Sequence, residues 1–364
     1  MPNTEDKFTT LFDYIKWRGD ILLSQVPLNE VDALALTQVA YMMFDNAFTQ
    51  QEKLSLEYAM CFVNESDYDG DYFAKIRYQF SVELAKCDRY KNLLLHNYTN
   101  IIDKEKTIQF AAVCFQIHDD LEFVAYRGTG DDIIGWHEDF NLTFLTPIPA
   151  QAYALQYFEN VFQNYTGQII LGGHSKGGNL AVYSALHCSE KLFQQIKDIY
   201  SFDGPGFSED FTGVERAEKV KKILKSYIPQ NCVVGILLNY FSTYTVVNSN
   251  SLGIFQHNAL SWNVQGAHFV QTEREDSSYH FENSLQAWLL SISKEKIAEI
   301  INVLFTSLGD SGIVYLSDLA KNPFKLVSAI SALNSLDSAN KKSLNELTKI
   351  VISYATECIG EQMK

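Results

Sequence analysis

Residues 168–183 read Gln-Ile-Ile-Leu-Gly-Gly-His-Ser-Lys-Gly-Gly-Asn-Leu-Ala-Val-Tyr. An apolar run leads directly into the pattern G-x-S-x-G at 173–177, and an amphipathic run follows without a break. A serine placed in this way between a strand and a helix sits on a sharp turn and presents its hydroxyl group at the edge of a sheet. The stretch therefore predicts a nucleophile elbow with Ser175 as the nucleophile.

The glycines of the pattern have a steric reason. Gly173 and Gly177 lack the side chains that would clash across so tight a turn. The helix that follows directs the N–H of Lys176 and the positive end of its dipole toward the nucleophile. The same residues also fit a glycine-rich turn that only packs, but the flanking strand and helix favour the catalytic interpretation.

Strands and helices alternate on both sides of the elbow. The pattern predicts strands at 107–117, 121–126, 168–171, 196–202, 223–228 and 244–248, and helices at 150–163, 177–188 and 214–221. Such alternation predicts an α/β class with a mostly parallel sheet and helices on both faces. With the elbow at its centre, this is the α/β-hydrolase fold, and we expect the sheet to end near Val270.

Helical segments flank this core. Apolar spacing predicts N-terminal helices at 8–24 and 30–47, the second capped by Asn29. Residues 50–105 are mixed, with a helical pattern and a Tyr-rich tail, and are a candidate lid or cap. Residues 282–361 are helical, with breaks at 309–312 and 322–323. We predict a hydrolase domain at 1–281, including the lid segment, and a helical C-terminal appendage at 282–364.

Composition narrows the possible partners. The 364 residues carry a formal net charge of −15, which argues against binding to nucleic acid or to anionic lipid. The six cysteines have no metal-ligand spacing, so we expect no metal, no cofactor and no disulfide framework. We see no signal peptide and no apolar run long enough for a transmembrane segment, and we expect a cytoplasmic protein. The oligomeric state does not follow from the sequence.

A second motif lies upstream at Tyr126-Arg-Gly-Thr129, where a predicted strand ends. The loop at this position of an α/β-hydrolase supplies one donor of the oxyanion hole, and the N–H after the nucleophile supplies the other. We therefore expect Thr129 and Lys176 to be the two donors, and Arg127 and Asp139 to form a supporting ion pair beneath the site. A glycine turn that merely ends the strand is the alternative.

The serine needs a base, and the chain order in this fold is serine, acid, histidine. His257 follows the last predicted strand by a loop, which is where this base belongs. His268 and His280 remain alternatives, whereas His187 lies along the elbow helix and points away from the strand ends.

The acid is predicted at Asp203, in the turn Asp-Gly-Pro-Gly that follows the strand at 196–202. The alternative is that Asp203 only caps its own Asx turn. The next strand is followed by Asn231, which can orient an imidazole but cannot stabilise its cation as a carboxylate does.

These motifs resemble two nested families. The looser resemblance is to class 3 (fungal-type) lipases, through 126–129 with Trp136 and Asp139, through 173–178 and through the downstream histidine. The closer resemblance is to an uncharacterised bacterial family that is treated as α/β-hydrolase-like. Its marks run in order through residues 8–270: Asp13-Tyr14, Trp17-Arg-Gly-Asp20, Asn29-Glu-Val-Asp32, Gly135-Trp-His-Glu-Asp-Phe140, His174-Ser-Lys-Gly-Gly-Asn-Leu-Ala181, Asp203-Gly-Pro-Gly-Phe207 and Gln256-His257.

The lipase resemblance implies Ser175 as nucleophile, Thr129 as oxyanion residue and His257 as base. Two positions depart from its pattern. Class 3 lipases usually carry a hydrophobic residue where this chain has Lys176. They also take the acid from the strand matching 223–228, after which this chain offers only Asn231 and Cys232. The acid is therefore either moved to Asp203 or missing.

The function that we expect is a serine hydrolase of lipase or esterase type. It would cleave a carboxylic ester or thioester of a small or lipid-like molecule through an acyl-enzyme on Ser175. One alternative is a pseudo-hydrolase that binds a ligand or partner in the same pocket. Another is acyl transfer to an acceptor other than water.

Overall fold

The central sheet of the computed structural model contains eight strands in the order of the chain. The structure describes residues 9–49, 51–69, 71–130, 132–208, 210–211, 213–240, 242–315 and 338–362. The strands are β1 (Lys53–Ser55), β2 (Leu94–Asp103), β3 (Ile108–His118), β4 (Leu121–Tyr126), β5 (Gln168–His174), β6 (Ile196–Phe202), β7 (Leu224–Pro229) and β8 (Thr245–Val247). A separate pair joins β9 (Val264–Gln265) to β10 (His268–Phe269).

The strand directions set the working edge of the sheet. Strands β1 to β4 pair antiparallel, and β4 to β8 pair parallel. Parallel strands end at the same edge, so the residues that follow β4, β5 and β6 come together there. Thr129, Ser175 and Asp203 follow these three strands. The predicted α/β-hydrolase fold, with a mostly parallel sheet between helices, is confirmed.

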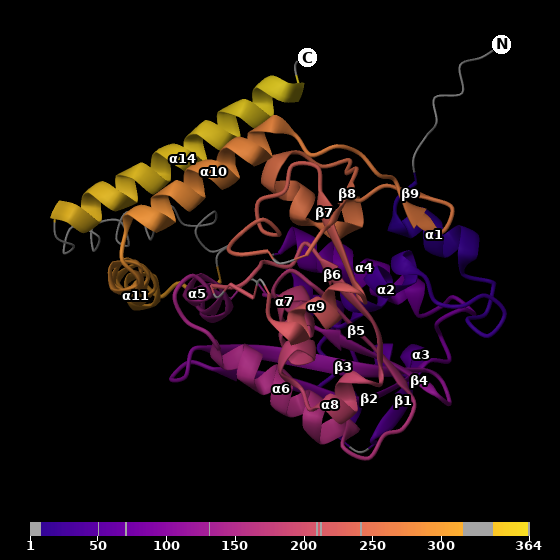
Figure 1. Ribbon diagram of the computed structural model, residues 1–364. Coiled ribbons are helices and arrows are strands. Elements are labelled where there is room, and N and C mark those ends of the chain that lie inside the picture. The colour runs from indigo at the N-terminus through magenta and orange to yellow at the C-terminus, as the bar shows by residue number, and fades with distance from the viewer. Residues whose placement is uncertain are drawn as a thin grey trace, which may run out of the picture.

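Helices cover both faces of the sheet (Figure 1). On one face, α1 (Leu11–Arg18), α2 (Glu30–Val39) and α4 (Tyr72–Leu84) share a core with side chains such as Val113 and Phe115. On the other, α6 (Pro149–Phe162), α7 (Lys176–His187) and α9 (Glu215–Lys221) pack on Ala112 and Cys114. Successive residues of β3 thus alternate between two cores, as side chains on a strand must. Shorter helices are α3 (Leu56–Met60), α5 (Ile133–Asn141) and α8 (Glu190–Phe193).

A buried polar network holds the N-terminal helices together. Asn29 caps α2 as predicted, accepting hydrogen bonds from the N–H groups of residues 31 and 32. The fully buried Asp32 accepts from the hydroxyls of Tyr14 and Tyr90 and pairs with Arg89 at 2.5 Å. The motifs around Tyr14 and Asn29 therefore have a structural purpose, because one carboxylate that accepts from Tyr14, Arg89 and Tyr90 ties distant segments to one point.

Within its described residues, the C-terminal region contains three helices. They are α10 (Asp276–Ser291), α11 (Lys294–Asp310) and α14 (Ser338–Gln362), and α10 and α14 lie side by side in Figure 1. Phe281, Tyr354 and Cys358 share an apolar cluster with Ile228 and Cys232 of the sheet region. The division of the chain at 281/282 stays a prediction, as does the role of the appendage as a separate unit. The expected break at 322–323 lies outside the described residues.

The candidate lid differs from its prediction in part. Residues 94–103 form strand β2 of the sheet, and the sequence analysis predicts no strand there. The strand escapes sequence detection because its polar residues and a bulge between His96 and Thr99 break the apolar alternation. A covering role for the residues before 94 stays a prediction. Phe73 on α4 stacks on Phe255, with ring centroids 6.2 Å apart.

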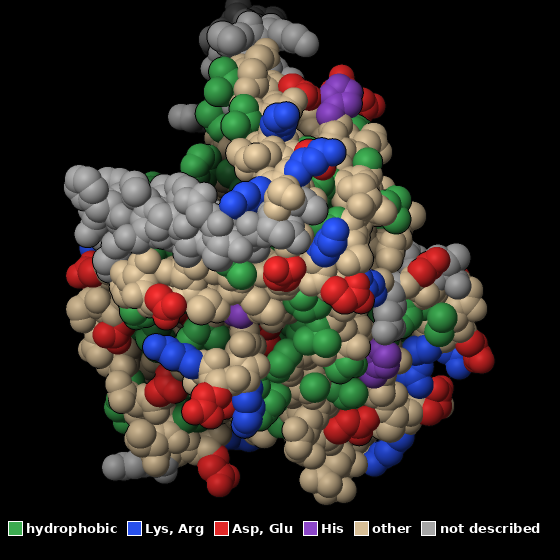
Figure 2. Space-filling view, turned by 90° about the vertical axis from the view of Figure 1, so that its left-hand side faces the viewer, with side chains coloured by type: hydrophobic (Ala, Val, Ile, Leu, Met, Phe, Trp, Pro, Cys, Tyr) green, Lys and Arg blue, Asp and Glu red, His purple; other side chains and the backbone are tan. Residues whose placement is uncertain are grey.

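Within the described residues, no helix is both long and apolar enough to cross a membrane. The face in Figure 2 intersperses acidic, basic and hydrophobic side chains and gathers no single basic patch. The absence of nucleic acid among the partners stays a prediction from the net charge of −15.

Candidate active site

The elbow has the geometry that its glycines allow. Ser175 lies between β5 and α7 with φ 58° and ψ −134°, a strained conformation for a residue with a side chain. A Cβ on Gly173 would lie 2.1 Å from the carbonyl carbon of Gly177, and one on Gly177 would lie 2.1 Å from the carbonyl oxygen of Tyr126. The turn therefore closes only because both positions lack a side chain.

His257 faces this serine. It ends the short 3-10 helix η3 (Gly253–His257), and its Nε2 lies 3.0 Å from Ser175 Oγ. Ser175 is 8% exposed and the His257 side chain 25% exposed, so both have only limited access to solvent. The structure brings together the predicted nucleophile and the predicted base at hydrogen-bond distance.

Asp203 completes the arrangement. Its Oδ2 lies 2.6 Å from Nδ1 of His257, and its Oδ1 accepts hydrogen bonds from the N–H of Gly235 and from the thiol of Cys232, each at 2.9 Å. The carboxylate is fully buried. The predicted acid therefore reaches the base, and the alternative Asx turn is not formed, because the N–H groups of residues 206 and 207 donate to backbone carbonyls instead.

The competing residues lie elsewhere. Asn231 accepts from Tyr354 and donates its backbone N–H to Gln256, so it supports the neighbouring loop and does not meet the Nδ1 of His257. His268 is 75% exposed and pairs with Glu30. The remaining candidates, His280 and His187, contact Glu357 and the ring of Tyr183 respectively.

His174 contributes a contact that the sequence did not predict. Its ring lies 4.8 Å from the ring of His257, between the backbone carbonyl of His257 and the hydroxyl of Tyr41. Burial and the neighbouring His257 hold the pKa of His174 well below its ordinary value, so the ring is neutral. No periodicity links Tyr41 to His174, which is distant in the chain. Only the position of His174 within the motif G-H-S-x-G indicates that it has a role.

The loop after β4 passes against the nucleophile. A Cβ on Gly128 would lie 3.0 Å from the Cβ of Ser175 and 2.2 Å from the hydroxyl of Tyr41. Thr129 follows, and its hydroxyl donates to Asp139 Oδ2 at 2.5 Å. The N–H of Gly130 donates to Gln109 at 2.9 Å. The loop is thus fixed from two sides directly beside the place where an oxyanion would form.

The other predicted donor, Lys176, begins α7, so its N–H belongs to the first turn, where helix N–H groups have no partner within the helix. Its side chain is only 1% exposed, and Nζ lies 2.8 Å from Glu138 and 3.4 Å from Asp139. Burial raises the pKa of Asp139 to about 6, against the opposing effects of Lys176 and Thr129. Glu138 was not predicted as part of the site.

The expected ion pair between Arg127 and Asp139 is wrong. Among the described residues, the cation that meets Asp139 is Lys176. Side chains alternate along a strand, and Tyr126 points into the core beneath α6 and α7. Arg127 therefore points toward the opposite face, where its charge acts on the hydroxyls of Tyr41 and Tyr68.

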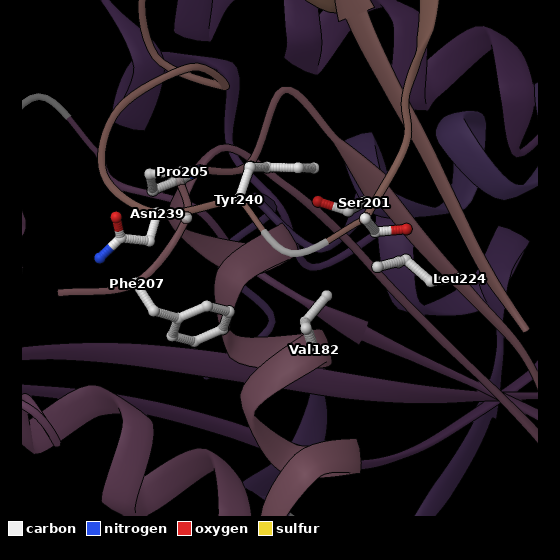
Figure 3. A pocket seen from close by; sticks show the side chains of 9 residues that line it. Val182, Ser201, Pro205, Phe207, Leu224, Asn239 and Tyr240 are labelled. Atoms are coloured by element: carbon white, nitrogen blue, oxygen red, sulfur yellow. The ribbon is translucent and has the colours of Figure 1, made fainter. Parts of the chain in front are cut away.

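A small cavity lies next to the turn that follows β6, and Pro205 and Gly206 of this turn contribute to its lining (Figure 3). Val182, Ser201, Phe207, Leu224 and Tyr240 contribute to its lining, and its volume of about 10 Å³ is that of one water molecule at most. It holds none of the candidate catalytic residues and is too small for a substrate. No group of side chains suited to hold a metal ion occurs among the described residues.

Comparison with known proteins places this geometry in context. The model of a family described as Mbeg1-like matches residues 84–306. No curated protein matches the chain.

Among solved structures, a Rhizomucor miehei lipase in its propeptide complex matches at 15% identity and a TM-score of 0.34, covering 44% of this chain and 59% of that one. The M37 lipase matches at 15% and 0.37, covering 58% and 70%. A lipase from Rhizopus microsporus var. chinensis matches at 13% and 0.33, covering 60% and 72%. The chain thus spans 59% of the length of the first of these lipases.

Proposed function

This chain belongs to the Mbeg1-like family, whose model matches more than half of it, and from that premise we propose that it is a serine hydrolase of lipase or esterase type. Its substrate is a carboxylic ester or thioester of a small or lipid-like molecule. The observation that carries the proposal is the chain of contacts from Ser175 Oγ to His257 at 3.0 Å and from His257 to Asp203 at 2.6 Å.

The proposed reaction follows from the roles of these atoms. Ser175 Oγ attacks the acyl carbon while Nε2 of His257 takes its proton, and the imidazolium then gives that proton to the leaving alcohol or thiol. Water repeats the sequence on the acyl-enzyme, with His257 again as base. The N–H groups of Thr129 and Lys176 receive the negative charge that develops on the carbonyl oxygen.

The surroundings of Asp203 support this assignment. A carboxylate on Nδ1 keeps the ring proton there, which leaves Nε2 free to accept the proton of the serine. The second oxygen of Asp203 is held by Gly235 and Cys232, so the carboxylate cannot rotate away from His257. The acid therefore comes from the end of β6, and the thiol of Cys232, which follows β7, donates a hydrogen bond to it.

The compartment belongs to the same proposal. All six cysteines are free thiols, which suits a reducing cytoplasm better than an oxidising one. Neither a metal nor an organic cofactor has a part in the proposed reaction.

Labelling with a fluorophosphonate tests the proposal directly. We expect wild type to be labelled and Ser175→Ala not to be, while His257→Ala slows labelling by orders of magnitude. His268→Ala is the matched control, because that histidine is exposed and remote, and it should be labelled at the wild-type rate. A folded wild-type protein that stays unlabelled would contradict the proposal and favour a pseudo-hydrolase. If the wild type is labelled, a comparison of product formation with water and with an alcohol as the acyl acceptor separates hydrolysis from acyl transfer.

A further inference from the structure

The residue directly after the candidate nucleophile carries a buried positive charge. Lys176 is 1% exposed, and its ammonium group contacts Glu138 at 2.8 Å and Asp139 at 3.4 Å. Both carboxylates lie on α5, which begins a few residues after Thr129. Burying a lysine is costly unless it is paired, so this geometry requires both helices to be in place.

The contacts form one continuous path between the two proposed oxyanion donors. The backbone of Lys176 supplies one N–H, and the side chain of the same residue binds Asp139. Asp139 in turn accepts a hydrogen bond from the hydroxyl of Thr129. The backbone N–H of Thr129 is the other proposed donor to the oxyanion. Glu138 anchors the path to the sheet and to α6 by accepting from the N–H groups of Gln109 and Ala150.

The charges of Lys176, Glu138 and Asp139 also indicate that the lysine side chain holds α5 in place. Without the ammonium group, the buried carboxylate of Glu138 and the partly buried carboxylate of Asp139 would repel each other beneath a site that has to stabilise an oxyanion. An apolar side chain after Ser175 would supply neither the attraction to α5 nor this compensation.

We propose that the side chain of Lys176 is a positioning residue of the oxyanion hole: through Glu138 and Asp139 it fixes the loop of Thr129 at the distance from the elbow that two converging N–H groups require. This inference rests on the proposed serine-hydrolase function. It assigns to the lysine side chain a task separate from that of its backbone N–H.

Three variants test it. Lys176→Met removes the cation, and Lys176→Met with Glu138→Gln also removes the carboxylate that would be left buried and unpaired. Arg89→Lys is the matched control, because it weakens a buried ion pair with Asp32 that is remote from the site. The measurements are the melting temperature, kcat and KM for p-nitrophenyl butyrate, the rate of fluorophosphonate labelling, and hydrogen exchange of peptides covering 127–135.

For Lys176→Met we expect a lower melting temperature and a kcat reduced by about 10- to 100-fold, with KM changed less than about twofold, because an oxyanion contact acts mainly in the transition state. The double variant should recover much of the melting temperature but none of the kcat. Exchange at 127–135 should be faster in both Lys176 variants and unchanged in Arg89→Lys.

Recovery of kcat together with the melting temperature in the double variant would overturn the inference, since the lysine would then act only on folding. Unchanged exchange at 127–135 in both Lys176 variants would also overturn it. If wild type shows neither turnover nor labelling, the proposed function fails, whereas the exchange measurement still decides whether Lys176 positions the loop.

Discussion

His174 donates a hydrogen bond from Nε2 to the backbone carbonyl oxygen of His257, at 2.8 Å. A carbonyl oxygen can only accept, so the ring proton lies on Nε2 and Nδ1 accepts from the hydroxyl of Tyr41 at 3.0 Å. The residue before the candidate nucleophile therefore holds the backbone of the candidate base, and a tyrosine from the N-terminal region sets its tautomer.

Tyr41→Phe should weaken this support. It leaves the buried Nδ1 of His174 without its donor, which costs about 1–3 kcal/mol of stability. We expect a lower melting temperature and a kcat reduced several-fold, with Ser175 still open to labelling. Tyr58→Phe is the control, because Tyr58 is 47% exposed and its ring meets Phe62 edge to face. Wild-type kcat in Tyr41→Phe would show that the hydroxyl of Tyr41 plays no part in holding the base.

Asp203→Asn should keep the fold and lose most of the turnover. An amide on Nδ1 of His257 favours the wrong ring tautomer and cannot stabilise the imidazolium, and in a serine protease this change costs about four decades of kcat. Steady-state hydrolysis of a short-chain ester measures it. Asp198→Asn, on the same strand but paired with Lys225, should behave as wild type. Full activity of Asp203→Asn would remove Asp203 from the triad.

Tyr354→Phe should lower kcat although the residue lies on α14. Its hydroxyl donates to the backbone and side-chain oxygens of Asn231 at 3.1 and 2.9 Å, and Asn231 holds Gln256, the neighbour of His257. Loss of about 1 kcal/mol of positioning corresponds to roughly a fivefold change in rate.

The control for Tyr354→Phe is Thr356→Ala, whose hydroxyl bonds only within the exposed side of the same helix. Equal kcat values for the two variants would show that α14 does not influence the base. A loss confined to Tyr354→Phe would tie the C-terminal region to the site.

Asp139→Asn should change the pH dependence of stability. The pKa of Asp139 is raised to about 6, chiefly by burial, so its folded-state pKa exceeds the ordinary value of 3.8. Such a group favours the folded state below pH 4, and this contribution is lost as the pH rises through 6. The variant should therefore gain stability relative to wild type above pH 6, by at most about 3 kcal/mol, and match it below pH 4.

Thermal unfolding between pH 4 and 8 measures this difference. Asp103→Asn is an opposite control, since the N–H of Lys106 lowers the pKa of Asp103, and that variant should lose stability at neutral pH and match wild type in acid. A pH-independent difference for Asp139→Asn would mean that Asp139 does not titrate near pH 6.

The sequence predicts best where a functional residue directly follows a buried strand. Ser175 and Asp203 are predicted because apolar runs mark the strand ends, and the carboxyl ends of parallel strands share one edge. His257 is predicted from the chain order serine, acid, histidine and from its loop after the last strand. Their roles in catalysis stay predictions, but their convergence is now a geometric fact.

The sequence does not predict which of several neighbouring charged side chains form ion pairs. Arg127 and Lys176 both flank the site, and only the alternation of β4 and the first turn of α7 decide which of them reaches Asp139. The sequence gives no sign of the contact between Tyr41 and His174 either, because the two residues are 133 positions apart in the chain. Such pairings depend on how the layers pack, which local patterns do not encode.

The contact between Tyr354 and Asn231 also affects the order in which parts of the site can fold while the chain is being synthesised. A ribosome adds about 5–20 residues per second, so Tyr354 leaves it several seconds after His257. During this interval the elbow and the acid can already be folded, while the turn that carries the base lacks its support from α14. On the proposed function, a nascent chain would therefore reach its full hydrolytic capacity only after α14 has been made.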